Sequence, residues 1–424
     1  MNRREFLALA GYASAATALP FSSIIRADDF VPYNGELLIT VQAVGGWDVS
    51  SFCDPKINTD STLINNWATG LTSNDIPKAG NIPYAPFANN AAFFEKFKDH
   101  MLVINGVDMQ TNSHSTGKKH TWSGRTASGY PSIAAWFAYN KAPTLPVSYL
   151  NFGGFTETAD LIRYSRIDKV DTLLEVLQPN VSTSGRGGNY YRQSDVERLV
   201  ASQQARLARL QEETHLLPRQ KSAMKSYYEA RPNTQALEQF AAVMPADDEI
   251  ESSSLLQQAQ VAILGFKAGV SCAADLAVGG FDTHGDHDTF HEPALTDITT
   301  LIDYLFDYAE QQGVAERLTV IVGSDFARTP YYNAGAGKDH WPVSSTLIMR
   351  KNAPWGNRVI GGSDEEQNSL TINPSTLQID DTGEGNIIYP MHVHAALRTE
   401  LGLPLDDFPL NNLEFLDLFN ESLI

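Results

Sequence analysis

The sequence predicts an α/β fold in which helices cover both faces of a largely parallel central sheet. Continuous apolar runs of strand length alternate with helical segments, which is the pattern of parallel strands that are buried on both faces. The 424 residues and the hydrophobic content of 42% suffice for one large α/β domain with a full core. Three of the predicted strands run into a glycine-containing turn that carries an aspartate, as expected where a site forms at the carboxyl edge of such a sheet.

The first 27 residues are predicted to be a twin-arginine export signal and not part of the fold. Arg3 and Arg4 precede an apolar run, Ala8 to Leu19, that is too short to span a bilayer. We expect cleavage near Ala27, although the residues before it make a poor small-residue site, and a disordered basic start is the alternative. Removal of residues 1–27 takes away three arginines and one glutamate, which moves the formal charge from −19 to −21. The mature chain is expected to be periplasmic or secreted, with the twin-arginine translocase as its partner during export.

The acidic balance of the chain argues against a nucleic-acid partner and against binding to anionic lipid. No segment after the signal is a transmembrane candidate, so no membrane span is expected in the mature chain. The chain has two cysteines, Cys53 and Cys272. Two buried free thiols are favoured over a disulfide, which an oxidising periplasm would allow. Because there is no Cys-x-x-Cys pair, neither a redox motif nor a thiolate zinc site is expected.

The first half of the chain reads as strands and helices separated by long polar loops. Residues 54–88 are rich in Pro, Asn and Gly and predict a long loop, and Thr111 to Arg125 predicts a polar loop. Ser182 to Asn189 predicts a flexible linker. Strands are predicted at Glu36–Val44, Met101–Val107 and Pro146–Asn151, and helices at Ala91–Lys98, Ile133–Tyr139 and Thr172–Leu177.

The second half predicts a helical insertion, residues 190–250, followed by a return to the sheet. The insertion lies within a single domain, residues 28–424, and is interpreted as a substrate lid, a dimer surface or simple decoration. Ser194 is placed as the N-cap of its long first helix. Insertion helices are predicted at Asp195–Glu213, Gln220–Glu229 and Thr234–Val243. Beyond them, strands are predicted at Ser271–Val278, Leu318–Val322 and Ser344–Met349, and helices at Ser253–Ala268, Pro293–Gln312 and Tyr389–Leu401.

Three predicted strands end beside an acidic residue, namely Asp48, Asp282 and Asp325. In an open parallel sheet these ends lie along one edge, where the three carboxylates repel one another unless a positive charge neutralises them. A divalent metal ion is the usual solution, and neighbouring histidines supply nitrogen ligands. His284, two residues after Asp282, and His340 are the candidates for that role.

The other histidines of the same region are interpreted differently. The loop from Gly279 to His291 holds three histidines and three aspartates, and a plain polar surface loop is the alternative to a site. His287 and His291 are spaced like one face of a helix, so they are expected to point away from the metal. Surface or helix-capping positions are predicted for His287, His291, His392 and His394.

The polar loop after the second strand is a candidate for the reacting group. It is dense in hydroxyl, histidine and lysine side chains, and Ser113 or Ser115 activated by a metal would suit the hydrolysis of a charged ester. Lys118, Lys119 or Arg328 would neutralise an anionic substrate. An ordinary polar loop that joins a strand to a helix is the alternative.

Taken in order, these motifs resemble the bacterial exported proteins grouped as the domain of unknown function 1501 family, which is related to the sulfatase and alkaline-phosphatase superfamily. The resemblance rests on the twin-arginine start and five later motifs: Gly45-Gly46-Trp47-Asp48, Ser113-His114, Gly279 to His284, Ser324 to Thr329, and Asp339-His340. It implies a parallel or mixed sheet, one or two divalent metals, and phosphate or sulfate ester hydrolysis through a Ser, Thr or modified Cys nucleophile. It also implies that Asp48 is the first metal ligand, Asp282 with His284 a second cluster, Asp325 the later carboxylate and His340 the last histidine.

The chain departs from the superfamily pattern in two places. The later Asp-His pair of the superfamily is here Asp325-Phe326, so one nitrogen ligand is missing. Neither cysteine lies in a Cys-x-Pro-x-Arg motif, so formylglycine chemistry is not expected. The resulting hypothesis is a periplasmic hydrolase of a small phosphate or sulfate ester that uses a divalent metal ion, whether zinc, calcium, magnesium or manganese. The alternative is a non-catalytic periplasmic binding or assembly protein on a degenerate phosphatase-like scaffold.

Overall fold

The computed structural model describes residues 31–166, 180, 188–212, 216–220, 234–246, 249–410 and 414–423. The predicted export signal lies outside these residues, as do the predicted helix at 172–177 and nearly all of the 182–189 linker and the 220–229 helix.

An eight-stranded sheet in the order β12-β4-β11-β8-β1-β7-β5-β6 forms the centre of the fold. Within it β11 runs antiparallel to both its neighbours, β4 and β8, and every other neighbouring pair is parallel. The prediction of a largely parallel α/β sheet is therefore confirmed. The strands are β1 (Leu37–Ala43), β4 (Met101–Asp108), β5 (Tyr149–Phe152), β6 (Tyr164–Arg166), β7 (Ala273–Val278), β8 (Leu318–Ser324), β11 (Val343–Arg350) and β12 (Arg358–Gly361).

The central strands are those with the most continuous apolar sequence. β1 is buried along its whole length, and Val41 pairs with Leu276 on one side and Val322 on the other. Burial on both faces is what removes the alternation of apolar and polar residues from such strands. The carboxyl ends of β1, β7 and β8 consequently lie side by side, and the segments that follow them meet at one edge of the sheet.

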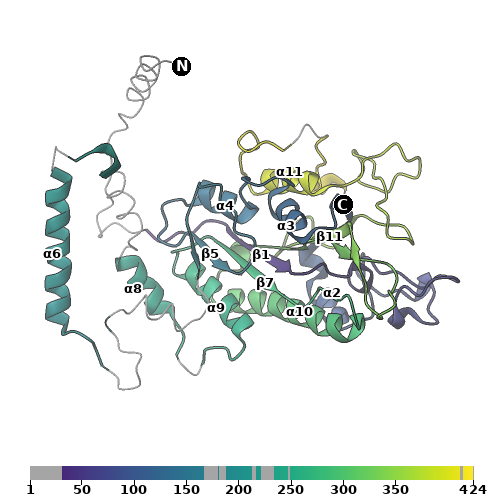
Figure 1. The fold of residues 1–424 in the computed structure, drawn as a ribbon, viewed down its shortest axis with the longest axis horizontal. Coiled ribbons are helices and arrows are strands. Elements are labelled where there is room, and N and C mark those ends of the chain that lie inside the picture. Colours follow the sequence, from purple (N-terminus) through teal and green to yellow (C-terminus); the bar gives the residue numbers. More distant parts are fainter. Residues whose placement is uncertain are drawn as a thin grey trace, which may run out of the picture.

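Helices cover both faces of the sheet (Figure 1). α4 packs on β1, β5 and β7 and α3 on β8, with α11 against α3; α9 and α10 lie against β7, with α2 against α10. The helices are α2 (Asn90–Phe97), α3 (His114–Ser123), α4 (Ile133–Lys141), α9 (Ser254–Lys267), α10 (His287–Gln311) and α11 (Pro390–Glu400). Short 3-10 helices are η2 (Val49–Ser51), η3 (Asn66–Ala68), η4 (Ser73–Asp75), η5 (Lys98–His100), η7 (Ala315–Arg317) and η8 (Glu421–Leu423).

Two predicted boundaries are wrong, and both errors fall next to the candidate site. The predicted polar loop at 111–125 contains α3, whose Gly117 lies so close to Asp325 that an added Cβ would fall 2.0 Å from the Asp325 carbonyl oxygen. Tertiary packing of this kind overrides a polar sequence. α10 begins at His287 and not at Pro293. The buried side chains of His287 and His291 anchor the start of the helix, although Pro293 lies inside it.

Small strand pairs escaped the sequence analysis. β9 (Ala327–Arg328) pairs antiparallel with β10 (His340–Trp341), which places His340 opposite Arg328 just beyond the end of β8. β2 (Lys78–Ala79) and β3 (Ile82–Pro83) form a second short pair within the predicted 54–88 loop. Two-residue strands bury too little to leave a periodic sequence signal.

Two described helices belong to the predicted insertion. α6 (Gln193–Glu212) stands away from the sheet in Figure 1, and its Leu199 and Val200 are exposed. α8 (Thr234–Val243) packs on α9, where Phe240 is buried. The extent of the insertion and its place within a single domain stay a prediction. In the part of the chain that the structure describes, no helix is both long and apolar enough to cross a bilayer.

Both cysteines are buried free thiols, as predicted. Burial raises the pKa of Cys272 to about 12 and moves the pKa of Cys53 upward as well. A thiol in this state is a small apolar group and not a nucleophile.

Candidate metal centre

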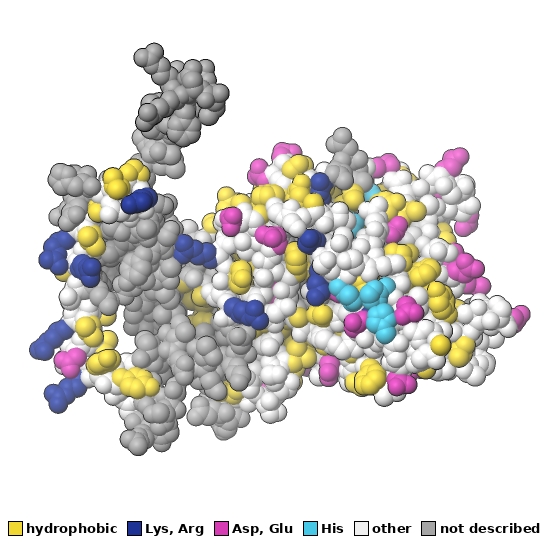
Figure 2. All heavy atoms as spheres, in the orientation of Figure 1, with side chains coloured by type: hydrophobic (Ala, Val, Ile, Leu, Met, Phe, Trp, Pro, Cys, Tyr) yellow, Lys and Arg dark blue, Asp and Glu magenta, His cyan; other side chains and the backbone are white. Residues whose placement is uncertain are grey.

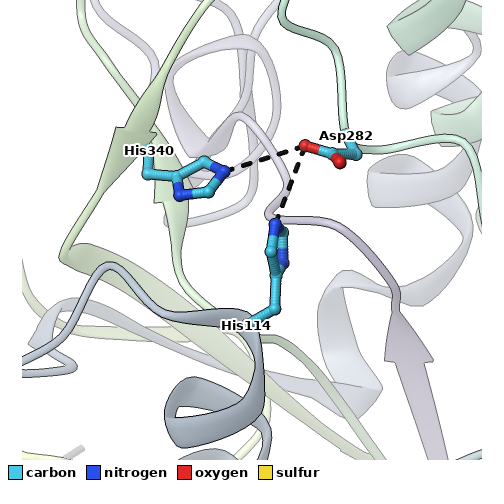
Figure 3. Close-up of side chains that lie close together, drawn as sticks. All are labelled: His114, Asp282 and His340. Atoms are coloured by element: carbon cyan, nitrogen blue, oxygen red, sulfur yellow. Dashed lines mark ion pairs between the residues drawn. The ribbon is translucent and has the colours of Figure 1, made fainter.

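Three side chains from distant parts of the chain point toward one another at the carboxyl edge of the sheet (Figure 3). His114 is the first residue of α3, Asp282 follows β7, and His340 lies in β10. The Asp282 Oδ1 atom lies 3.7 Å from His114 Nε2 and 3.8 Å from His340 Nε2. A fourth side chain joins them, because His284 Nε2 lies 3.2 Å from the same oxygen. We call these four side chains the His-Asp cluster.

Each imidazole of the cluster uses its Nδ1 atom to hold a fixed acceptor. His114 Nδ1 lies 2.7 Å from Asp325 Oδ2, and His284 Nδ1 lies 2.7 Å from Asp339 Oδ1. His340 Nδ1 lies 2.8 Å from the carbonyl oxygen of Asn112. Carboxylates and carbonyls only accept hydrogen bonds, so each Nδ1 carries a proton and Nε2 is the nitrogen that faces Asp282. Imidazoles that bind metals are oriented through their second nitrogen in this way.

The Nε2 atoms of His284 and His340 lie 3.0 Å apart. With both Nδ1 atoms protonated, two lone pairs face each other across that gap, which is favourable only if a proton or another cation lies between them. Ligand atoms about 2.0–2.1 Å from a tetrahedral zinc lie roughly 3.3 Å from one another. The three distances to Asp282 Oδ1 and the distance between His284 and His340 are 3.0–3.8 Å, and these four values bracket that separation.

Arg328 donates a hydrogen bond to the carboxylate of the cluster from inside the protein. Its Nη2 donates to Asp282 Oδ1 at 2.6 Å and also to the carbonyl of Gly45, while Nε donates to the carbonyl of Gly46 at 2.9 Å. Nη1 donates to the carbonyl of Lys338 at 3.0 Å. The side chain is fully buried, and its donors are engaged within the protein. Arg328 is therefore placed to fix Asp282 and the surrounding loops.

The charges of the cluster favour a cation over a proton. Partial burial by itself raises the pKa of Asp282, but the hydrogen bond from Arg328 and the nearby imidazoles outweigh it and lower that pKa. Burial lowers the pKa of His340, and the Arg328 charge acts in the same direction. The hydrogen bond from His284 lowers the pKa of Asp339. At neutral pH the carboxylates are thus ionised and His340 is neutral, as metal ligands must be.

Asp325 lies under the cluster and not in it. It is fully buried, and while Oδ2 holds His114, Oδ1 accepts a hydrogen bond of 2.7 Å from Gln42. The neighbouring Phe326 packs its ring 4.6 Å from the His114 ring and 4.4 Å from the His340 ring. The two imidazole rings also contact each other, with centroids 4.6 Å apart, so Phe326 packs against both members of this pair.

The face that carries the cluster is visible in Figure 2, where histidine side chains gather with acidic side chains beside them. The side chains of Asp282 and His284 are 56% and 47% exposed, so a ligand reaches them from solvent.

A family model described as "Protein of unknown function (DUF1501)" matches residues 154–376, just over half of the 424 residues. The chain belongs to this family. The comparison with curated proteins found no match.

Solved structures similar to this DUF1501 protein share little sequence with it. A protein in the alkaline phosphatase superfamily from Vibrio parahaemolyticus is 8% identical over 95% of this chain and 76% of that chain, with a TM-score of 0.38. Alkaline phosphatase from the Antarctic bacterium TAB5 is 10% identical over 78% and 95%, with a TM-score of 0.34. A 2-O GAG sulfatase is 6% identical over 88% and 71%, with a TM-score of 0.35. Similarities of this size do not assign an activity.

In the DUF1501 protein Asp48 belongs to a separate buried centre. Its Oδ2 accepts hydrogen bonds from Lys338 Nζ at 2.6 Å, Ser51 Oγ at 2.9 Å and His287 Nε2 at 3.1 Å. Asn65 Oδ1 also accepts from Lys338 Nζ, at 2.9 Å. Burial by itself raises the pKa of Asp48, but the Lys338 ammonium and the His287 hydrogen bond outweigh it and hold that pKa well below its usual range. The ammonium thus neutralises the carboxylate for which a metal was predicted.

His287 and His291 are fully buried at this centre, so the predicted surface position for both is wrong. The backbone N–H of Asp48 donates to His291 Nε2 at 3.1 Å, and the rings of the two histidines stack 4.5 Å apart. Burial lowers the pKa of both, so both are neutral. Among the described residues, His291 Nδ1 has no hydrogen-bond partner.

His392 and His394 are also buried and not on the surface. His392 Nδ1 accepts from the backbone N–H of Tyr389 at the start of α11, so the capping half of its prediction agrees with the structure. His394 Nε2 lies 2.8 Å from the carbonyl of Thr121, which links α11 to α3.

The predicted nucleophiles lie at the start of α3, next to the cluster. Ser113 and Ser115 are exposed, and their Oγ atoms lie 3.3 Å from each other. Ser113 directly precedes His114, and Lys118 and Lys119 follow on the same helix. The structure brings Asp282, His284 and His340 together, sets Arg328 and Asp325 beneath them, and leaves Asp48 out.

Two residues of these centres were missed from the sequence. His114 appeared only as part of a motif, although it follows β4 and so reaches the same sheet edge, which is the signal that would have found it. Lys338 lay unassigned in a motif because its partner, Asp48, is 290 positions away. No local pattern marks such a pair.

Proposed function

We propose that this DUF1501 protein is an exported, metal-dependent hydrolase of phosphate or sulfate esters. The observation that carries the proposal is the convergence of three imidazole Nε2 atoms on one oxygen of the Asp282 carboxylate at the sheet edge. Divalent metals bound in this way polarise an ester and lower the pKa of a bound water or hydroxyl.

The donor set favours one kind of metal ion. Three imidazole nitrogens and one carboxylate suit zinc, with manganese or iron as alternatives, whereas calcium and magnesium prefer all-oxygen sites. Asp282 would hold the ion through a carboxylate that Arg328 already fixes. His114, His284 and His340 would be presented in fixed orientations by Asp325, Asp339 and Asn112.

The chain's own residues would bind and orient the ester around that ion. Arg328 keeps Asp282 in place, which makes it a positioning residue in this proposal. Ser113 and Ser115 are the hydroxyls nearest in sequence to His114 and remain the proposed nucleophiles. Ser113 is the N-cap of α3 and Ser115 lies in its first turn, where the helix N-terminus favours the negative charge of an ester oxygen.

Metal analysis of the purified mature protein, with a screen of phosphate and sulfate esters, tests the proposal. We expect about one zinc, manganese or iron per chain, and loss of that metal in Asp282→Asn because the anionic ligand is removed. Asp286→Asn is the matched control, since Asp286 is an exposed aspartate of the same loop and asparagine suits its left-handed backbone.

The possible results separate the two hypotheses. A protein that holds no metal and cleaves no ester contradicts the proposal. A protein that holds the metal through Asp282 but cleaves no ester favours the non-catalytic binding or assembly protein. Unchanged metal content in Asp282→Asn removes Asp282 from the site.

A further inference from the structure

A cavity of about 480 Å³ opens near the carboxyl ends of β1 and β5. Gln42 near the end of β1, Lys118 of α3, the segment 153–158 that follows β5, and Tyr164 of β6 line it. Of these residues only Lys118 has a role in the metal hypothesis, as one of three cations that could neutralise an anionic substrate. A volume of this size suits the organic part of a small ester far better than it suits a bare phosphate or sulfate ion.

The cavity shares a wall with the cluster. Gln42 lines the cavity and donates to Asp325 Oδ1, and the other oxygen of Asp325 holds His114. Lys118 comes four residues after His114 on α3, so the two side chains lie on one face of the helix, about 6 Å apart along its axis. A ligand held by the cluster therefore extends naturally toward Lys118.

Lys118 is the charged group of this cavity that is left without a partner. Within the described residues it makes no hydrogen bond or ion pair, although the protein carries 50 acidic residues against 31 basic ones. Glu157 also lines the cavity, but its Oε1 accepts from the backbone N–H of Ala159 at 3.0 Å. Figure 2 shows further Lys and Arg side chains on the same face, beside the histidines.

The floor of the cavity is rigid. The backbone N–H of Gly154 and Nδ2 of Asn151 both donate to the buried Asp275 Oδ1, at 2.7 Å each. A Cβ on Gly154 would fall 2.6 Å from that oxygen, so only glycine fits there. Tyr164, which is 45% exposed, adds an aromatic surface at the rim. A preformed site of this kind binds without first paying for the ordering of a loop.

We propose that this cavity binds a second anionic group, carried on the alcohol part of the ester, and that Lys118 selects for it. The inference rests on the proposed function, because it assumes that the cluster holds the phosphate or sulfate end. The substrate class is then a phosphate or sulfate ester whose alcohol part bears its own negative charge.

Binding of two matched phosphonates to the metal-loaded protein tests the proposal without relying on turnover. Propylphosphonate ends in a methyl group, and 3-phosphonopropionate ends in a carboxylate at the same chain length. We expect calorimetry to show about tenfold tighter binding of the carboxylate probe, as one charge-assisted contact provides. Lys118→Gln is expected to abolish this preference and leave propylphosphonate binding unchanged.

Lys267→Gln is the matched control, since Lys267 is an exposed lysine at the end of α9 and does not line the cavity. It is expected to bind both probes as the unaltered protein does. Equal binding of the two probes by the unaltered protein overturns the second site alone, and so does a preference that survives Lys118→Gln. If the metal-loaded protein binds neither probe, the proposed function fails, and the inference fails with it.

Discussion

At the scale of the residue, each functional side chain of the cluster has two polar atoms, and the hydrogen bond made by one atom sets the direction in which the other points. Each imidazole of the cluster donates a hydrogen bond from Nδ1 to a fixed acceptor, and its Nε2 therefore faces Asp282. Asp325 illustrates the same point, because its two oxygens join Gln42 of the cavity wall to His114 of the cluster. The acceptor at Nδ1 therefore determines the orientation of each imidazole in the cluster.

Asp275 gives a prediction at this scale, because a buried carboxyl makes stability depend on pH. Burial raises the pKa of Asp275 to about 6, against the hydrogen bonds that lower it. The folded chain holds this proton more tightly than the unfolded chain, so the group stabilises the fold below its ordinary pKa and that stability is lost as pH rises through about 6. The loss is about 2–3 kcal/mol.

Urea unfolding of the unaltered protein and of Asp275→Asn, each between pH 4 and 7.5, measures this effect. Asp275→Asn has no proton to lose at this position, so its free energy of unfolding should not fall as the pH rises. The difference in free energy of unfolding between the variant and the unaltered protein is therefore expected to shift in favour of the variant by about 2–3 kcal/mol. Asp297→Asn on the exposed side of α10 is the control. A pH-independent difference between Asp275→Asn and the unaltered protein contradicts the prediction.

At the scale of the element, the loop before α10 and the loop before β10 lie next to the cluster, and the buried Asp48 centre connects them. The loop before α10 supplies Asp282 and His284, and between them Thr283 bonds through Oγ1 to His287 Nδ1 at 2.6 Å. The loop before β10 supplies Lys338, whose backbone N–H donates to the Thr283 carbonyl at 3.0 Å and whose ammonium reaches Asp48. The Asp48 centre is thus a support for the cluster.

Lys338→Met is predicted to destabilise the fold by about 3–5 kcal/mol, because it leaves the Asp48 carboxylate buried without its cation. The double variant Lys338→Met with Asp48→Asn removes both charges and is expected to recover part of that loss. Urea unfolding measures both. A double variant that is no more stable than the single one shows that lost packing, and not the unpaired charge, is the cause.

The same elements show how far sequence reasoning reaches. Strands such as β1 and β8 were predictable because burial on both faces makes them continuously apolar. α3 was not, because its inner face is Gly117, His120 and Trp122, a set without an aliphatic stripe. Asp282 and His284 were predicted as polar residues beyond a strand end, and His340 was predicted as a further candidate histidine. Whether Asp48 met a metal or an ammonium depended on a lysine far along the chain, which no local pattern encodes.

At the scale of the whole molecule, the carboxyl edge of one sheet brings three features together. The His-Asp cluster, the Asp48 centre and the cavity all lie beyond the ends of β1, β5, β7 and β8, on segments that are far apart in sequence. Antiparallel β11 does not disturb this arrangement, because it inserts between β8 and β4 and leaves the order β8-β1-β7-β5 intact. An α/β sheet gathers its functional groups at this edge for topological reasons.

Export is the prediction that concerns the molecule as a whole. If Arg3 and Arg4 form a twin-arginine signal, replacing both with lysine keeps the charge but removes the paired guanidinium groups that the route requires. Arg3→Lys with Arg4→Lys is expected to remain in the cytoplasm as full-length precursor, whereas the unaltered chain is recovered from the periplasm and shortened near Ala27. Cell fractionation with mass measurement of the intact chain distinguishes the two. Arg26→Lys, which makes the same exchange outside the pair, is expected to be exported normally. Equal periplasmic recovery of the double variant and the unaltered chain would show that export does not depend on the paired arginines. The chain would then have to fold and acquire its metal outside the cytoplasm.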